Sequence, residues 1–188
     1  MNYKNILIIL IFFIFPNKSF GLIEVDITRG NLNPLPIAIS SLSSDISTKN
    51  ELLKLLKVQD VGLEISKVIE NNFRQSGLFN PLNKDSFLQK PDIAHLKPRF
   101  EDWSLIKAQA LITGKVTYSE DKLRVEFRLW DVLAAKEMMA LAFTTVPKNW
   151  RRVGHIISDK VYERLTGEKG YFDTRIIFVS EKGPKTQR

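Results

Sequence analysis

The feature that most constrains the fold is a strict alternation of side chains near the middle of the chain. Over residues 123–130, LRVEFRLW, every second residue is apolar and most of those between are charged. Because successive side chains of a strand point to opposite faces, one face of this segment is apolar while the other can meet water. The alternation therefore predicts a half-buried strand, which needs neighbours to bury its apolar face.

Two further strand-like segments flank this one. Residues 110–118 precede it across a turn at 119–121, and residues 137–146 follow it across a second turn at 132–136. Connections this short join neighbouring antiparallel strands. We therefore expect an antiparallel meander of three strands.

Two long stretches have the apolar spacing of amphipathic helices. The first runs over about 60–76, with Asp60 in its first turn and Gly77 as its stop. The second runs over about 149–165 and ends before Gly167. Shorter predictions complete the chain: strands at 22–28 and 36–39, a loop at 40–50, a helical turn at 51–57, an extended exit at 78–82, an irregular stretch at 85–99, a short helix at 101–106 and a strand at 174–180. Together they predict an α+β fold, a mixed, largely antiparallel sheet packed with two long helices, and we expect all the helices to lie on one face of the sheet.

The N-terminus has the pattern of an export signal. Lys4 precedes an uncharged apolar run at 6–15, which Pro16 ends. The run is too short for a membrane-spanning helix, which takes about 20 apolar residues. We therefore expect a signal peptide at 1–21, cleaved after Gly21; an uncleaved anchor is the alternative. In either case the folded part works outside the cytoplasm.

Composition narrows the class of protein. Of the 188 residues, removal of 1–21 takes away two lysines and no acid, so the formal charge falls from +7 to +5. The remaining chain is long enough for one domain with a core. There is no cysteine, which excludes disulfides and thiolate chemistry. The basic residues are interspersed with acids, so we expect a solvated surface and no nucleic-acid partner.

Residue patterns for catalysis or metal binding do not emerge. The two histidines, His95 and His155, have no second histidine at helical spacing, so neither completes a metal-binding face. Nucleophile-elbow serines and glycine-rich phosphate loops are absent from the sequence. We expect no enzyme, no cofactor and no metal. Three tryptophans are interpreted as core or rim residues and not as ligand platforms: Trp103, Trp130 and Trp150.

A basic cluster marks the start of the second long helix. Lys148, Arg151 and Arg152 gather at the helix end where the macrodipole disfavours cations. An acidic partner would relieve this conflict, and we expect Asp131 or a neighbouring domain to supply it. A solvated cluster is the alternative.

Several stretches of the mature chain match, in order and spacing, one known pattern. They are the strand directly after the signal, then 74–82 (RQSGLFNPL), 100–103 (FEDW), 125–132 (VEFRLWDV), and 162–170 (YERLTGEKG) running into 172–176 (FDTRI). In these stretches the chain resembles the N-terminal domain of the TolB family, the periplasmic component of the Tol–Pal envelope system. Together they cover nearly the whole mature chain.

The resemblance implies the domain organisation and the biological role. It implies a domain at 22–170, followed at 171–188 by the opening of a six-bladed β-propeller, so that the chain is expected to be a fragment or a truncated product. It also implies a periplasmic, non-catalytic subunit of the system that maintains outer-membrane integrity and invagination during cell division. Binding of the lipoprotein Pal belongs to the propeller and is not carried over.

The resemblance further assigns a segment that binds the partner protein TolA. It consists of Leu22, Ile23, Glu24, Val25, Asp26, Ile27 and Thr28. A free alternating strand can add to the edge of a partner's sheet, where main-chain hydrogen bonds give affinity and alternate side chains fix the register. The alternative is a strand permanently paired in its own sheet. Two other functions remain open, a periplasmic carrier of small ligands and a domain that binds anionic surfaces.

Overall fold

The computed structural model describes residue 23 and residues 33–174. Its strands are β1 (Leu35–Ile39), β2 (Phe79–Pro81), β3 (Ala110–Ser119), β4 (Lys122–Asp131) and β5 (Lys136–Thr145). Its helices are α2 (Ile46–Leu56), α3 (Val61–Ser76), α4 (Pro91–Ala94), α5 (Phe100–Leu105) and α6 (Trp150–Thr166), with short 3₁₀ turns η1 (Lys84–Ser86) and η2 (Pro147–Asn149). The predicted strands at 22–28 and 174–180 lie outside the described residues, apart from Ile23 and Thr174.

The sheet has the order β2-β1-β3-β4-β5 and is mixed, as predicted. The meander β3-β4-β5 is antiparallel, whereas β1 pairs in parallel with both β2 and β3. The β3–β4 turn contains Glu120 at φ 50° and Asp121 at φ 57°. Two left-handed residues define the type I′ turn, whose twist matches that of the flanking strands. The α+β class and the meander are confirmed.

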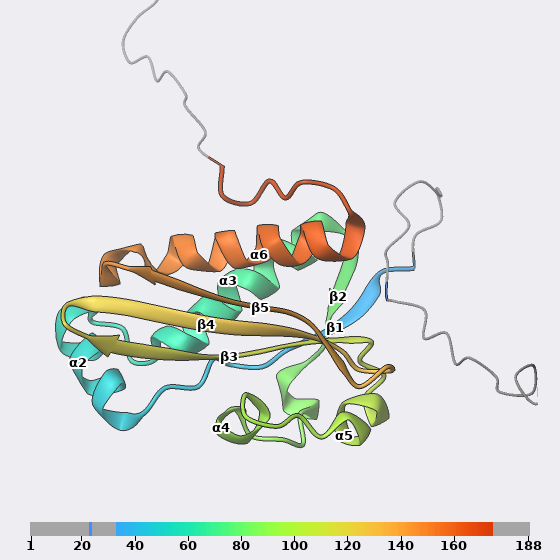
Figure 1. Cartoon of the computed structure of the whole chain (residues 1–188), viewed down its shortest axis with the longest axis horizontal. Coiled ribbons are helices and arrows are strands. Elements are labelled where there is room, and N and C mark those ends of the chain that lie inside the picture. Colours follow the sequence, from blue (N-terminus) through green and yellow to red (C-terminus); the bar gives the residue numbers. More distant parts are fainter. Residues whose placement is uncertain (1–22, 24–32, 175–188) are drawn as a thin grey trace, which may run out of the picture.

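Both long helices lie where periodicity placed them. Asp60 caps α3 by accepting from the Leu63 amide at 3.0 Å, and Gly77 ends the helix in the left-handed conformation. α6 ends at Gly167, also left-handed. Figure 1 shows α6 and α3 together on one face of the sheet. Between them and the sheet lies the main core, which includes Ile37, Ile69, Phe73, Phe127 and Ile157.

Two predictions about local structure were wrong. The loop expected at 40–50 contains the start of α2, because the Asp45 carboxylate accepts from the Thr48 amide at 2.7 Å and caps the helix. That hydrogen bond holds the pKa of Asp45 below its ordinary value. Helices are also not confined to one face: α4 and α5 cover part of the other face (Figure 1). Trp103 there joins a second, smaller core with Leu111 and Val132.

A buried glutamine organises the stretch expected to be irregular. Gln89 accepts from the Trp103 indole at 3.1 Å and from the Arg99 amide at 2.9 Å, and it donates to the Lys97 carbonyl. The Gln89 side chain thus pairs backbone groups that no helix or strand pairs in this segment, because buried backbone groups need hydrogen-bond partners. Residues of this segment thereby form part of the second core.

The contact between α3 and α6 depends on small and polar residues. A Cβ at Gly154 would lie 2.8 Å from Val68 Cγ1, so the backbones approach as closely as a glycine allows. The Asn72 amide donates to Ser158 Oγ at 2.8 Å and lies 3.0 Å from His155 Nδ1. We call this contact the α3–α6 seam.

Replacement of Gly154 by alanine tests the seam. We expect Gly154→Ala to lower the free energy of unfolding by about 1–3 kcal/mol, because the new methyl group collides with Val68 in a packed interface. The gain in helix propensity of about 1 kcal/mol acts in the opposite direction. Urea unfolding measures the change. Lys160→Ala, at an exposed position of the same helix, should change stability by less than about 0.5 kcal/mol. Equal changes in the free energy of unfolding for the two substitutions would contradict a tightly packed α3–α6 seam.

Candidate protein-interaction surfaces

The predicted partner-binding segment begins on the surface of the domain. Ile23 is half-buried and packs against the main core. The other six residues of Leu22–Thr28 lie outside the described residues, so their binding role stays a prediction.

The basic cluster has an acidic partner, but not the one expected. Arg152 forms a two-pronged pair with the Asp173 carboxylate at 3.0–3.1 Å, and this raises the pKa of the guanidinium. The prediction of Asp131 was wrong: that side chain is buried and accepts from the Ala134 amide in the β4–β5 turn. Arg151 instead lies over the ring of Trp150, 5.0 Å from its centre.

Residues 168–174, which we call the return segment, run back along α6. The Asp159 carboxylate accepts from the Phe172 amide at 2.6 Å and from the Asp173 amide at 3.1 Å. Gly170 passes so close to α6 that an added Cβ would lie 2.4 Å from Asp159 Cα. Phe172 packs on Phe73 of α3 and Tyr162 of α6. The return segment is therefore fastened to α6 and α3.

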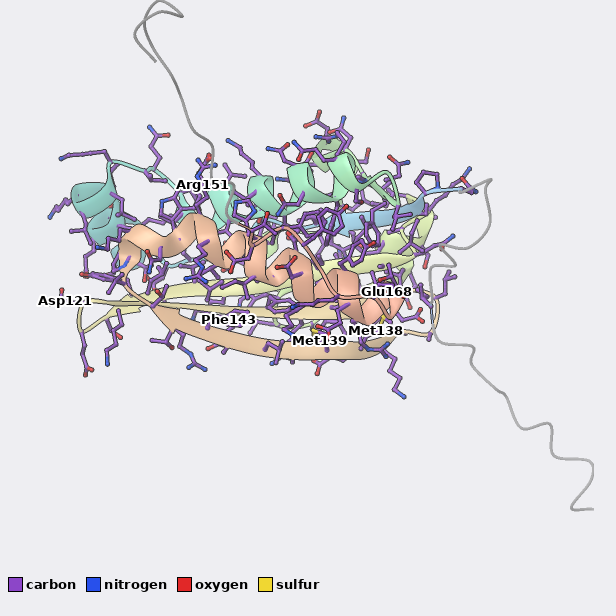
Figure 2. The ribbon with its side chains drawn as sticks, turned by 90° about the horizontal axis from the view of Figure 1, so that it is seen from above. Asp121, Met138, Met139, Phe143, Arg151 and Glu168 are labelled. Carbon is purple, nitrogen blue, oxygen red and sulfur yellow. The ribbon has the colours of Figure 1, made fainter. Side chains whose placement is uncertain are left out.

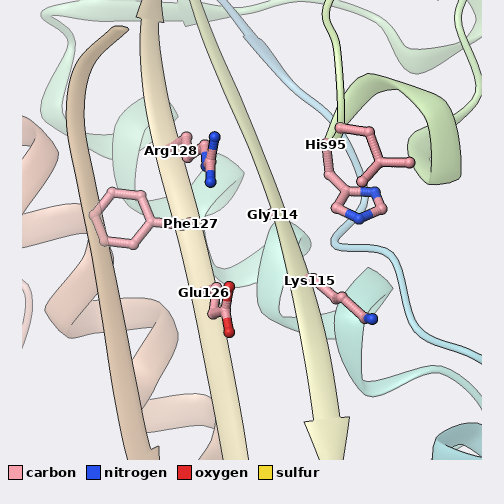
Figure 3. Close-up of a pocket in the computed structure, with 7 residues that line it drawn as sticks. His95, Gly114, Lys115, Glu126, Phe127 and Arg128 are labelled. Atoms are coloured by element: carbon pink, nitrogen blue, oxygen red, sulfur yellow. The ribbon is translucent and has the colours of Figure 1, made fainter.

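A polar hollow lies where α4 meets the sheet (Figure 3). It has a volume of about 250 Å³, and its lining includes His95, Lys115, Glu126 and Arg128. A larger open hollow of about 620 Å³ adjoins it at the start of α2 and shares His95 and Lys115.

The acidic side chain of the smaller hollow, Glu126, pairs with Arg124 at 2.8 Å. In the larger hollow, the Asp92 carboxylate accepts from the Ser43 hydroxyl at 2.8 Å. Within the described residues, no serine in the lining of either hollow forms a hydrogen bond with His95, whose Nδ1 lies 3.4 Å from the Pro91 carbonyl oxygen.

The remaining histidine and two of the tryptophans make contacts within the fold. His155 lies in the α3–α6 seam, and the described residues contain no cluster of three or more metal-ligating side chains. Trp103 is buried in the second core, and Trp130 donates to Thr113 at 2.9 Å and packs on Phe100. Among the described helices, none combines the length and apolarity needed to cross a bilayer.

Sequence reasoning missed the residues that hold the return segment. Asp159 and Asp173 were not assigned this role, because their partners are 13 to 21 residues away along the chain. The usable signal was the glycine at 170 followed at once by Tyr171 and Phe172. A glycine before aromatic residues, just after a helix stop, indicates a close backbone approach followed by a packed anchor.

The geometry is that of a small α+β domain built on a mixed five-stranded sheet. The family model of the TolB amino-terminal domain matches residues 23–138. The Tol-Pal system protein TolB of Pelagibacter ubique (strain HTCC1062) is 75% identical over 179 residues, which are 95% of this chain. The chain therefore belongs to the TolB family.

The same comparison limits what can be transferred, because the chain spans only 40% of the length of that relative. The crystal structure of TolB from Acinetobacter baumannii is similar in fold, with a TM-score of 0.59 at 20% identity. That match covers 81% of this chain and 33% of the other. At this level of identity the likeness supports the fold alone.

Removal of the Asp159 carboxylate tests how the return segment is held. In Asp159→Ala we expect hydrogen exchange at the Phe172 and Asp173 amides to accelerate at least about tenfold, because both lose a charged acceptor. Arg152→Ala is the matched control, since an exposed ion pair contributes only about 0–1 kcal/mol. Unchanged exchange in Asp159→Ala would show that the aromatic packing alone holds the segment.

Proposed function

We propose that the chain is a non-catalytic interaction module of the Tol–Pal envelope system, working in the periplasm after removal of residues 1–21. The observation that carries this proposal is the 75% identity to a Tol-Pal system protein over almost the whole chain. The proposed organisation is a domain at 22–170 with 171–188 leading toward a propeller. The fastened return segment supports a role for this domain in presenting whatever follows it in a defined direction.

We further propose that Leu22–Thr28 binds TolA by strand addition. The support is the alternation of Ile23, Val25 and Ile27 with Glu24 and Asp26, which suits an added strand with one apolar and one polar face. Ile23 already packs on the core, so the segment starts at the domain and not on a distant tail. Binding would then place the partner directly beside the α+β domain.

Calorimetric titration with the soluble C-terminal domain of TolA tests this proposal. We expect the mature chain to bind and a chain lacking residues 22–28 not to bind. Equal affinity of the two would refute the assignment of the segment.

Two proline variants then test the strand geometry. Only every second amide of an added strand bonds to its partner, so Val25→Pro and Asp26→Pro should differ in affinity by about tenfold or more. Similar losses in both variants would indicate recognition by side chains alone. Neither variant should change the unfolding midpoint, because in this proposal the segment pairs with the partner's sheet and not with its own.

A further inference from the structure

All the sulfur of the proposed mature chain lies at one place. The sequence has three methionines and no cysteine, and removal of residues 1–21 takes away Met1. The two methionines that remain, Met138 and Met139, are consecutive in β5. We call them the methionine pair. Any reaction of the mature chain that needs a sulfur atom therefore takes place there.

A bulge in β5 turns both members of the pair toward the same core. Neighbouring residues of a regular strand point to opposite faces of the sheet. Here the register shifts: Leu129 pairs with Met139 and Trp130 with Glu137, so Met138 is the extra residue. An extra residue bends the strand and redirects a side chain. Accordingly, Met138 and Met139 both pack against the main core between the sheet and the long helices.

The pair lies where β5 meets α6. Arg164 of α6 donates from its Nε to the Met138 carbonyl at 3.4 Å. Met139 stands opposite Leu129 of β4, which is fully buried. Figure 2 shows the pair on β5 beside α6. The two thioethers therefore contribute to the packing that joins the last strand of the sheet to the core.

A small oxidant can reach this pair while the domain stays folded. Both side chains are half-buried, in contrast to the fully buried residues of the main core. Within the described residues β5 pairs only with β4, so the pair lies on an edge strand of the sheet. The susceptibility of a sulfur atom to oxidation follows its exposure.

Oxidation changes what the pair can pack against. A peroxide transfers one oxygen atom to a thioether sulfur; its O–O bond breaks, the sulfur is oxidised, and the peroxide is reduced to water. The product, methionine sulfoxide, is polar and chiral, whereas the main core is apolar. A buried sulfoxide oxygen would need a hydrogen bond that apolar side chains do not offer.

We propose that the methionine pair is an oxidation site, at which a peroxide converts both thioethers to sulfoxides and thereby loosens β5 from the core. The change is reversible, because methionine sulfoxide reductases restore the thioether. The site shares no residue with Leu22–Thr28 and does not rest on the TolA assignment, so each proposal can fail alone.

Hydrogen peroxide serves as the probe of accessibility. We expect it to add two oxygen atoms to the folded mature chain, at rates within about tenfold of those in an unfolded peptide that contains both methionines. Mass spectrometry of the intact chain and of its peptides counts and locates the oxygen atoms. Slower oxidation than this in the folded chain would overturn the proposal.

Hydrogen exchange measures the structural consequence. We expect oxidation to accelerate exchange of the amides that pair β4 with β5 beside the bulge at least about tenfold, and methionine sulfoxide reductase to reverse the change. Unchanged exchange after complete oxidation would overturn the proposal. Peroxide should have no effect on a chain with both Met138→Leu and Met139→Leu, because leucine keeps the volume without the sulfur. If that chain fails to fold, each single variant should take up one oxygen atom and show a smaller acceleration.

A methionine placed elsewhere in β5 provides the matched control. In the double leucine variant, Leu141→Met puts one thioether on the core-facing side of the strand but outside the bulge, at a position that is 38% exposed. We expect it to be oxidised and to accelerate exchange by less than about threefold, because a sulfoxide at that position reaches water. An acceleration equal to that of the native pair would refute the assignment of the effect to the bulge.

Discussion

The α3–α6 seam is the contact on which the rest of the domain depends. Gly154 lets the two helix backbones meet over Val68, and Asn72 bridges to Ser158 and His155 within the same interface. Two helices held this closely act as one layer, which covers the sheet across β1, β3 and β4. A buried polar bridge also fixes the register of the two helices, because any slide would leave the Asn72 amide without partners.

The seam also supports the return segment. Phe172 packs against Phe73 of α3 and Tyr162 of α6, and the Asp159 carboxylate of α6 accepts from the backbone of the segment. Because α6 is itself held by α3, the return segment rests on both long helices of the core.

Much of the fold could be predicted from the sequence, because periodicity and turn chemistry act locally. The alternation at 123–130, the stops at Gly77 and Gly167, and the cap at Asp60 were sufficient to define the meander and both long helices. The start of α2 was missed because Asp45 lies in a serine-rich stretch that also suits a loop, and its cap becomes evident only from the hydrogen bond to Thr48. The cover of α4 and α5 on the second face was missed, since it depends on Gln89, whose partners are 8 to 14 residues away.

For the candidate sites, the segment at 22–28 could be proposed from its alternation and family resemblance. The partner of Arg152 could not, because Asp173 reaches it only after the return segment passes α6 closely at Gly170.

Native-state hydrogen exchange over the whole mature chain tests the central claim most directly. If the α3–α6 seam is the contact on which the domain depends, the slowest amides of α3, α6, β3 and β4 will exchange through one opening with the same free energy as global unfolding. An opening of α6 with the return segment at lower free energy, with α3 and the sheet still protected, would contradict the account. The seam would then be a consequence of the fold, and the sheet alone would hold the domain together.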